Sequence, residues 1–288
     1  MNKPKQILVA DAGGTKTAWL YVNTATQEQK RFTSLGIHPL FLSARQIENI
    51  LSREVAPQFA SFPETDLQIF FYGAGCEASD RQGIIHQGIQ TAFPDADINV
   101  ASDLLGAVKS LCGKEAGVGC ILGTGSNSAA YDGNQITQQQ ISLGFWLGDE
   151  GSGGYMGKEL LTDALRKKLP ADLQEKFEAT HRLDLALTLK RMYQEPTPNQ
   201  YAASFTSFLR LNRGHDYVEA LLDRSFSLFI ELELLNINNI ESLPIHCTGG
   251  VAITFADAWQ RNLKKYNLIV GTISDDILPA LARYHQDQ

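Results

Sequence analysis

Cysteine is scarce in this sequence of 288 residues, and its four copies, Cys76, Cys112, Cys120 and Cys247, are widely separated. No two of them form a C-x-x-C pair, so the spacing excludes a zinc ribbon and gives no sign of a disulfide framework. We therefore expect reduced, buried thiols in a cytoplasmic protein.

Basic runs and long apolar runs are also missing. The net charge is −7 and no basic stripe offsets it, which argues against nucleic acid as a partner. The most apolar helical stretch, 226–235, is interrupted by Glu231 and Glu233, so it predicts a core helix and no membrane span. Residues 1–6 are polar and lead directly into a four-residue apolar strand, a pattern too short for a signal peptide.

Glycine-rich loops after short apolar strands are the most informative feature that the chain does contain. One such loop, residues 123–128, follows the apolar run 118–122. Gly123 and Gly125 expose consecutive backbone N–H groups, and Thr124 and Ser126 add hydroxyl donors. This is the chemistry of a loop that wraps an anionic oxygen, most often a phosphate.

A carboxylate pair follows this loop. Asp149 and Glu150 lie within the glycine-rich stretch 148–153, which leads straight into a helical pattern at 155–169. We expect both acids to stand at the helix entrance and to face the loop at 123–128. A phosphate cradle beside a carboxylate cluster indicates phosphoryl transfer.

An earlier glycine loop, Asp11-Ala12-Gly13-Gly14-Thr15-Lys16-Thr17, lies between two apolar strand patterns. It is not a Walker A loop, which needs four residues between its glycines and Gly-Lys-Ser/Thr before a helix. Asp11, at the end of the first strand, suits a Mg²⁺ ion held through water, since that ion usually keeps several of its waters. The alternative is that Asp11 is a simple turn residue.

The order of elements at 7–34 is repeated at 118–141, with a strand, a glycine turn, a second strand and a hairpin in each. In the second copy Asp132-Gly133 predicts a two-residue hairpin turn. The repeat predicts an α/β fold with two similar lobes whose phosphate turns face each other across a cleft. We expect one lobe at 1–113, joined by a C-terminal helix within 272–288, and the other at 114–271.

Strands and helices alternate in most of the chain, and helices dominate after residue 155. The expected strands are 7–10, 18–22, 31–34, 67–72, 98–101, 118–122, 128–131, 244–247 and 268–271. The expected helices are 44–55, 80–92, 104–111, 155–169, 171–179, 184–193, 200–211, 217–235, one ending at 263 and 275–284. We interpret the helices after 155 as scaffold, and expect His181, His215 and His285 at the surface.

Asp103 lies between an expected strand and an expected helix. A carboxylate at the carboxyl end of a strand in an open α/β sheet points toward the ligand. Capping of the helix is the default role for such a residue. The functional alternative is a general base that accepts a hydroxyl proton during transfer to phosphate.

Gly249 and Gly250 lie at another strand-to-helix junction. Two glycines there let a flat ring or a ribose approach the backbone closely. A plain tight turn explains the pair equally well.

With three glycine loops and Asp103 in this order, the chain resembles the N-acetylglucosamine kinase and BadF/BadG/BcrA/BcrD-type ATPase family of the sugar kinase, Hsp70 and actin superfamily. The resemblance covers essentially the whole chain. Its most specific parts are the motifs at 11–17, 123–127 and 147–152.

The resemblance implies two ribonuclease-H-like lobes, ATP and Mg²⁺ as cofactors, and an N-acetylated amino sugar as the small-molecule substrate. It implies that the loops at Gly13 and Gly125 bind phosphate, and that Gly249 and Gly250 bind adenosine. It makes Asp103 the catalytic base. Dimerisation is common in that family, although a single sequence identifies no interface.

The resemblance also implies a sugar site. Asp149 matches the residue that hydrogen-bonds the acylated amino sugar, and we expect Glu150 and Asn127 beside it. His38 stands where the family usually has a sugar-contacting Asn, and Leu143 where animal members have a Trp. Both departures concern the identity of the sugar. The cysteine-rich zinc motif of another bacterial sugar kinase group is absent.

Four readings follow. An N-acetylglucosamine kinase is the first. The second is an N-acetylmuramic acid kinase, in which His38 donates a hydrogen bond to the lactyl carboxylate of that sugar. The alternative role for His38 is that it only replaces the Asn contact or forms a hydrogen bond within its own loop. The third, a dehydratase-activating ATPase, needs cysteines that hold an iron–sulfur cluster at a dimer interface. The fourth is a non-catalytic sugar or nucleotide sensor.

Overall fold

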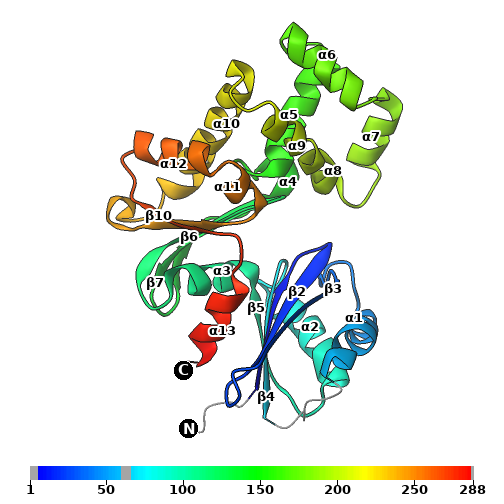
Figure 1. Ribbon diagram of the computed structural model, residues 1–288, viewed down its shortest axis with the longest axis vertical. Coiled ribbons are helices and arrows are strands. Elements are labelled where there is room, and N and C mark those ends of the chain that lie inside the picture. The colour runs from blue at the N-terminus through cyan, green and yellow to red at the C-terminus, as the bar shows by residue number, and fades with distance from the viewer. Residues whose placement is uncertain (1–5, 60–65, 287–288) are drawn as a thin grey trace. The chain divides into compact units, whose positions relative to one another are not determined.

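The computed structural model describes residues 6–59 and 66–286, which form two compact units (Figure 1). The first unit contains residues 1–115 together with 276–288, and the second contains 116–275. Each unit is built on its own five-stranded sheet. Among the described residues, no helix is both long enough and apolar enough to cross a membrane.

The sheet of the first unit has the strand order β3-β2-β1-β4-β5. The strands are β1 (Gln6–Ala12), β2 (Lys16–Asn23), β3 (Gln29–Leu35), β4 (Leu67–Gly73) and β5 (Asp97–Ser102). The first three form an antiparallel meander, whereas β4 and β5 run parallel to β1. Because β1, β4 and β5 are parallel, their carboxyl ends meet at one edge of the sheet.

Helices cover both faces of this sheet, as the alternation along β1 requires. Leu8 and Ala10 lie on one face of the sheet. This face is covered by α1 (Ala44–Ile50), the π-helical η1 (Leu51–Val55), the short 3₁₀ helix η2 (Ala56–Phe59) and α2 (Ser79–Ala92). Ile7 and Val9 lie on the opposite face and pack against α13 (Leu278–Gln286). There α13 lies next to α3 (Asp103–Cys112) in Figure 1. The C-terminal helix therefore completes the core of the first unit.

The second sheet repeats this arrangement with the order β10-β9-β6-β7-β8. Its strands are β6 (Ala116–Leu122), β7 (Ser126–Asp132), β8 (Ile136–Gln139), β9 (Ile245–Thr248) and β10 (Val270–Ser274). Again the first three are antiparallel and the last two run parallel to the first. The internal duplication and the two-unit α/β fold inferred from the sequence are thus confirmed.

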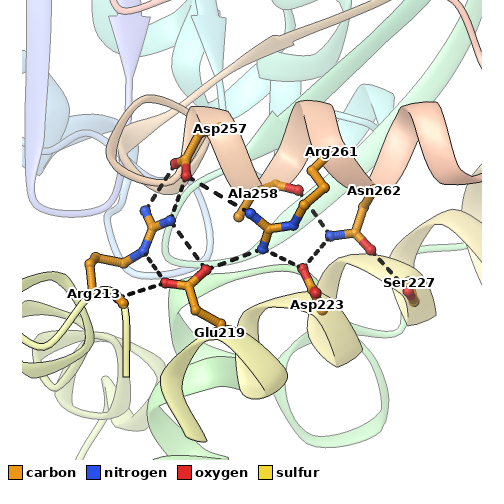
Figure 2. A network of polar contacts seen from close by, with 9 residues as sticks. Arg213, Glu219, Asp223, Ser227, Asp257, Ala258, Arg261 and Asn262 are labelled. Atoms are coloured by element: carbon orange, nitrogen blue, oxygen red, sulfur yellow. Dashed lines mark hydrogen bonds and ion pairs between the residues drawn. The ribbon is translucent and has the colours of Figure 1, made fainter. Parts of the chain in front are cut away.

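Helices of the second unit pack on its sheet around one large apolar core. They are α4 (Gly144–Leu147), α5 (Gly153–Leu165), α6 (Ala171–Thr180), α7 (Leu185–Tyr193), α8 (Pro198–Ser204), α9 (Thr206–Leu211), α10 (Asp216–Phe229), the π-helical η3 (Ile230–Leu234), η4 (Ile240–Ser242), α11 (Gly250–Thr254) and α12 (Ala256–Lys265). Figure 2 shows the polar network that ties α10 to α12, in which the Arg213 guanidinium bonds Glu219 and Asp257.

Several local expectations are wrong. The hairpin after β7 has three connecting residues, 133–135, because the Asp132 carboxylate accepts the N–H groups of Asn134 and Gln135 and widens the turn. The helix expected at 200–211 breaks at Phe205, and the one ending at 263 breaks at Phe255, because both phenylalanines turn into the core.

His285 corrects a further expectation, since it is buried and not at the surface. Its ring stacks on Phe70 with 3.5 Å between centroids, and its Nε2 lies 2.8 Å from the Tyr72 hydroxyl. It is part of the contact between α13 and β4. The four cysteines are buried thiols, as expected.

Candidate functional site

The loop between β1 and β2 holds the residues expected to bind phosphate. The Gly13 N–H donates to the Lys16 carbonyl at 3.1 Å and closes the turn. The N–H groups of Gly14 and Thr15 donate to no described residue, and Gly14, Thr15 and Lys16 are exposed. Two adjacent amides that face solvent form a small anion-binding concavity.

Thr17 differs from the rest of that loop because its side chain is fully buried. Its hydroxyl oxygen accepts the Ile37 N–H at 3.2 Å, and the Thr15 carbonyl accepts the Gly36 N–H at 3.0 Å. A Cβ on Gly36 would lie 2.5 Å from Gly14. Thr17 thus fastens the segment that carries His38 to the loop, and its contact with phosphate remains a prediction.

Asp11 lies beside this loop near the end of β1. The pKa of its carboxyl is raised to about 6, mainly by burial and also by the Asp276 carboxylate, against the lowering effects of Lys16 and Arg31. Asp276 stands just before α13 and pairs with Arg31. The sequence argument missed Asp276, although an acid after the last strand was the available signal.

Asp103 stands at the carboxyl end of β5, two strands away from Asp11 in the same sheet. The helix is capped by Ser102, whose hydroxyl accepts the Leu105 N–H, so Asp103 is free of the default capping role. Its Oδ1 accepts the Leu104 N–H at 2.8 Å, which fixes the carboxylate. Burial raises the pKa of Asp103 to about 6, and the Glu77 and Asp11 carboxylates add to the rise.

His38 lies at the same edge, over the end of β4. A Cβ on Gly75, whose φ is +80°, would lie 2.7 Å from the imidazole ring. Nδ1 accepts the Leu40 N–H at 3.2 Å, so the proton of the neutral ring is on Nε2. Burial lowers the pKa of His38, with opposing effects from Glu77 and Arg81. A neutral imidazole at pH 7 therefore offers one N–H donor.

The second unit carries the other glycine loop, between β6 and β7. The Gly123 N–H donates to the Gly125 carbonyl at 2.9 Å, and the Thr124 and Gly125 N–H groups donate to no described residue. This repeats the pattern of the loop at Gly13. The Gly123 and Thr124 carbonyls accept the N–H groups of Gly153 and Gly154 at the start of α5, so the helix terminus holds the loop in place.

Asp149 packs directly against this loop, as expected. A Cβ on Gly125 would lie 3.0 Å from Asp149 Oδ2, and the Ser126 N–H donates to the carboxylate. The φ of Asp149 is +60°, a left-handed value that few non-glycine residues adopt. Burial raises the pKa of Asp149 to about 6, and Glu150 raises it further. The Ser126 hydroxyl donates to the Glu150 carbonyl at 2.7 Å.

A cavity of about 370 Å³ opens beside Asp149. Three residues expected to contact sugar, Asn127, Asp149 and Glu150, line it together, and the structure thus brings them to one place. Leu143 also lines the cavity and is 59% exposed. Glu233, which lies on η3 about 80 residues further along the chain, was not foreseen from the sequence.

Gly249 has a clear structural reason to be glycine. Its φ is +107°, and a Cβ would lie 2.4 Å from the Leu122 carbonyl oxygen at the end of β6. A Cβ on Gly250 would meet open space. The pair therefore borders the glycine loop at Gly123, and the contact of Gly249 and Gly250 with adenosine remains a prediction.

Comparisons with known proteins were made for the whole chain. No protein-family model and no curated protein matches it. Among solved structures, a Porphyromonas gingivalis protein assigned as an N-acetylglucosamine kinase is 34% identical, covers 98% of this chain and 99% of its own, and superposes with a TM-score of 0.91.

Two further structures show the fold alone. A Chromobacterium violaceum protein with the same assignment is 17% identical over 98% of this chain and 99% of its own, with a TM-score of 0.74. A ROK family glucokinase from Streptomyces griseus, in complex with glucose and AMPPNP, is 12% identical over 98% of each chain, with a TM-score of 0.57. With 34% identity to the first protein over nearly its full length, the chain belongs to the N-acetylglucosamine kinase family of actin-like sugar kinases.

Proposed function

We propose that this ATP-dependent sugar kinase transfers the terminal phosphoryl group of ATP to a hydroxyl of an N-acetylated amino sugar, and that N-acetylglucosamine is the preferred acceptor. Asp103 carries the proposal. Asp103 is a half-buried carboxylate that does not cap its helix and is held by the Leu104 N–H, which supports a role as general base.

The pKa of Asp103 suits that role. A value of about 6 leaves the carboxylate ionised at neutral pH while making it a stronger base than an ordinary aspartate. Asp103 would accept the proton of the acceptor hydroxyl as the phosphoryl group moves. Such a base contributes about 10²–10⁴-fold to the rate.

The two glycine loops would hold the phosphates of ATP. The loop at Gly14 and Thr15 and the loop at Thr124 and Gly125 each offer two adjacent N–H groups to an anion. Backbone donors of this kind are fixed before the substrate arrives, so they stabilise developing negative charge without reorganising. Gly250 would leave space for the adenosine.

Asp11 fits a magnesium ion. Its carboxylate acts together with a second one, that of Asp276, which raises the pKa of Asp11 in addition to the larger effect of burial. Oxygen donors are what Mg²⁺ prefers, and the ion keeps several waters. When bound, Mg²⁺ neutralises charge on the phosphate oxygens. Asp11 would hold it through water.

A neutral N-acetylated sugar fits better than N-acetylmuramic acid. Asp149 presents a carboxylate that can accept the acetamido N–H, and His38 Nε2 can donate to a hydroxyl or carbonyl oxygen. Because burial and Arg81 lower the pKa of His38, and outweigh the opposing effect of Glu77, the histidine has no positive charge to pair with a lactyl carboxylate.

The proposal is tested by measuring ADP release with Mg-ATP and N-acetylglucosamine, N-acetylmuramic acid, glucosamine or glucose. We expect turnover that depends on an acetylated amino sugar and is lost in folded Asp103→Asn. ATP binding without turnover on any of these sugars would refute the kinase assignment and favour a sensor.

A further inference from the structure

We infer that Glu233 is a specificity-determining residue of the proposed sugar site, and that it makes the cavity select uncharged over acidic sugars. The inference rests on the proposed function, because it concerns the acceptor of that reaction. Glu233 lines the same cavity as Asn127, Asp149 and Glu150.

The backbone around Glu233 places its side chain in the cavity. Helix α10 continues at Ile230 as the π-helical η3, in which the Leu235 N–H donates to the Ile230 carbonyl five residues earlier. Such wide turns are rare and occur often at functional sites. Glu233 is half-buried, whereas Glu231 and Leu232 on the same turn are exposed.

The Glu233 carboxylate is held in place and retains capacity to bind. The hydroxyl of Ser128, which is fully buried on β7, donates to Glu233 Oε2 at 3.4 Å. A carboxylate accepts several hydrogen bonds, so the remaining lone pairs can accept a sugar hydroxyl or amide N–H. Burial and the nearby Glu150 and Asp149 carboxylates all raise the pKa of Glu233.

The charged residues that line the cavity are all acidic: Asp149, Glu150 and Glu233. None of the described lining residues is Lys, Arg or His. Lys158 lowers the pKa of Asp149, but its ammonium donates to the Phe145 carbonyl and lies over the Phe145 ring. An acidic substituent on the sugar would therefore meet carboxylates and no cation among the residues that line the cavity.

Exposed leucines line the same cavity as the acids. Leu143 is 59% exposed, Leu147 75% and Leu232 51%. An acetyl methyl group and the carbon face of a pyranose ring can cover such side chains, while hydroxyls and the amide N–H turn to the acids. Cavity and ligand then match in both polarity and charge.

The test compares wild type with Glu233→Gln, which keeps the shape and removes the charge. N-acetylglucosamine and N-acetylmuramic acid are titrated by calorimetry and used as substrates. Wild type should favour N-acetylglucosamine in kcat/KM by about 100-fold or more. Glu233→Gln should raise KM for N-acetylglucosamine about 10-fold, because a charge-assisted hydrogen bond is weakened.

Glu233→Gln should also reduce the ratio of kcat/KM for N-acetylglucosamine to kcat/KM for N-acetylmuramic acid by at least about 10-fold, and should leave the KM for ATP unchanged. Glu231→Gln is the matched control, because this acid lies on the same π turn, bonds Tyr266 and does not line the cavity. Glu233→Asp retains the charge and should keep the preference for the uncharged sugar. This variant tests the inference even if Glu233→Gln is poorly folded.

The inference is overturned if Glu233→Gln matches Glu231→Gln in both KM and sugar preference, or if Glu233→Asp loses that preference. In either case the kinase proposal stands as long as wild type phosphorylates an acetylated sugar. If wild type binds neither sugar, the proposed function itself fails.

Discussion

Replacing Asp103 by Asn should separate stability from catalysis. In the folded protein this carboxyl keeps its proton up to about pH 6, whereas an ordinary Asp loses it near 3.8. The folded state thus binds more protons between these values, and the contribution of Asp103 lowers stability as the pH rises through them. One pKa unit is about 1.4 kcal/mol, so ionised Asp103 costs the folded protein about 3 kcal/mol above pH 7.

Asparagine removes this cost and keeps an acceptor for the Leu104 N–H, though a weaker one. We expect the free energy of unfolding to rise by about 1–3 kcal/mol at pH 8, and to equal that of wild type only near pH 3, where Asp103 is protonated in both the folded and the unfolded state. Turnover should fall by about 100-fold or more. Urea unfolding at both pH values and ADP release measure the two effects.

Asp132→Asn is the control, because Asp132 is an exposed acid whose pKa is lowered by backbone N–H donors. It should give no gain in stability at pH 8. If Asp103→Asn is no more stable than wild type at pH 8, or is stabilised by the same amount near pH 3, then burial does not raise the pKa of Asp103 as described. Retained turnover would refute the role as a base.

Three further predictions follow from local geometry. Gly249→Ala forces a methyl group against the Leu122 carbonyl at a φ of +107°, and should lower the free energy of unfolding, measured in urea, by more than about 2 kcal/mol. Gly250→Ala should change that free energy by no more than about 0.5 kcal/mol. Equal effects of the two variants would contradict the close approach of Gly249 to Leu122. Long-range ¹H–¹⁵N spectra of His38 should show the Nε2–H tautomer and a titration midpoint below 6.5, and a midpoint above that value would contradict its burial. Arg213→Met should destabilise the protein by about 1–2 kcal/mol at pH 7 and by less near pH 3. Arg213 lowers the pKa of Asp257, so this ion pair stabilises the protein above the ordinary pKa of an aspartate and weakens as the pH falls through the lowered pKa of Asp257. Thermal melts that show no such pH dependence would contradict this prediction.

The strands and the duplication could be predicted because each depends on local pattern. Apolar runs such as 7–10 and 118–122 become β1 and β6, and each is followed by a glycine turn that cannot continue a helix. Asp103 could be placed at a strand end for the same reason. What it does there could not be predicted, since Ser102 rather than Asp103 caps the helix.

The features that sequence reasoning missed all depend on contacts between distant segments. His285 is buried because Phe70 and Tyr72 on β4 receive it. Glu233 reaches the cavity through a π turn, which no periodicity reveals. Asp276 influences Asp11 only because α13 returns to the first unit.

The central claim is that ATP gives its phosphoryl group to an N-acetylated sugar and not to water. ³¹P NMR of the protein with Mg-ATP and N-acetylglucosamine tests this most directly. The account predicts one new phosphomonoester resonance that grows in step with ADP and is missing with Asp103→Asn. Inorganic phosphate as the sole new product, at the same rate with and without sugar, would contradict it.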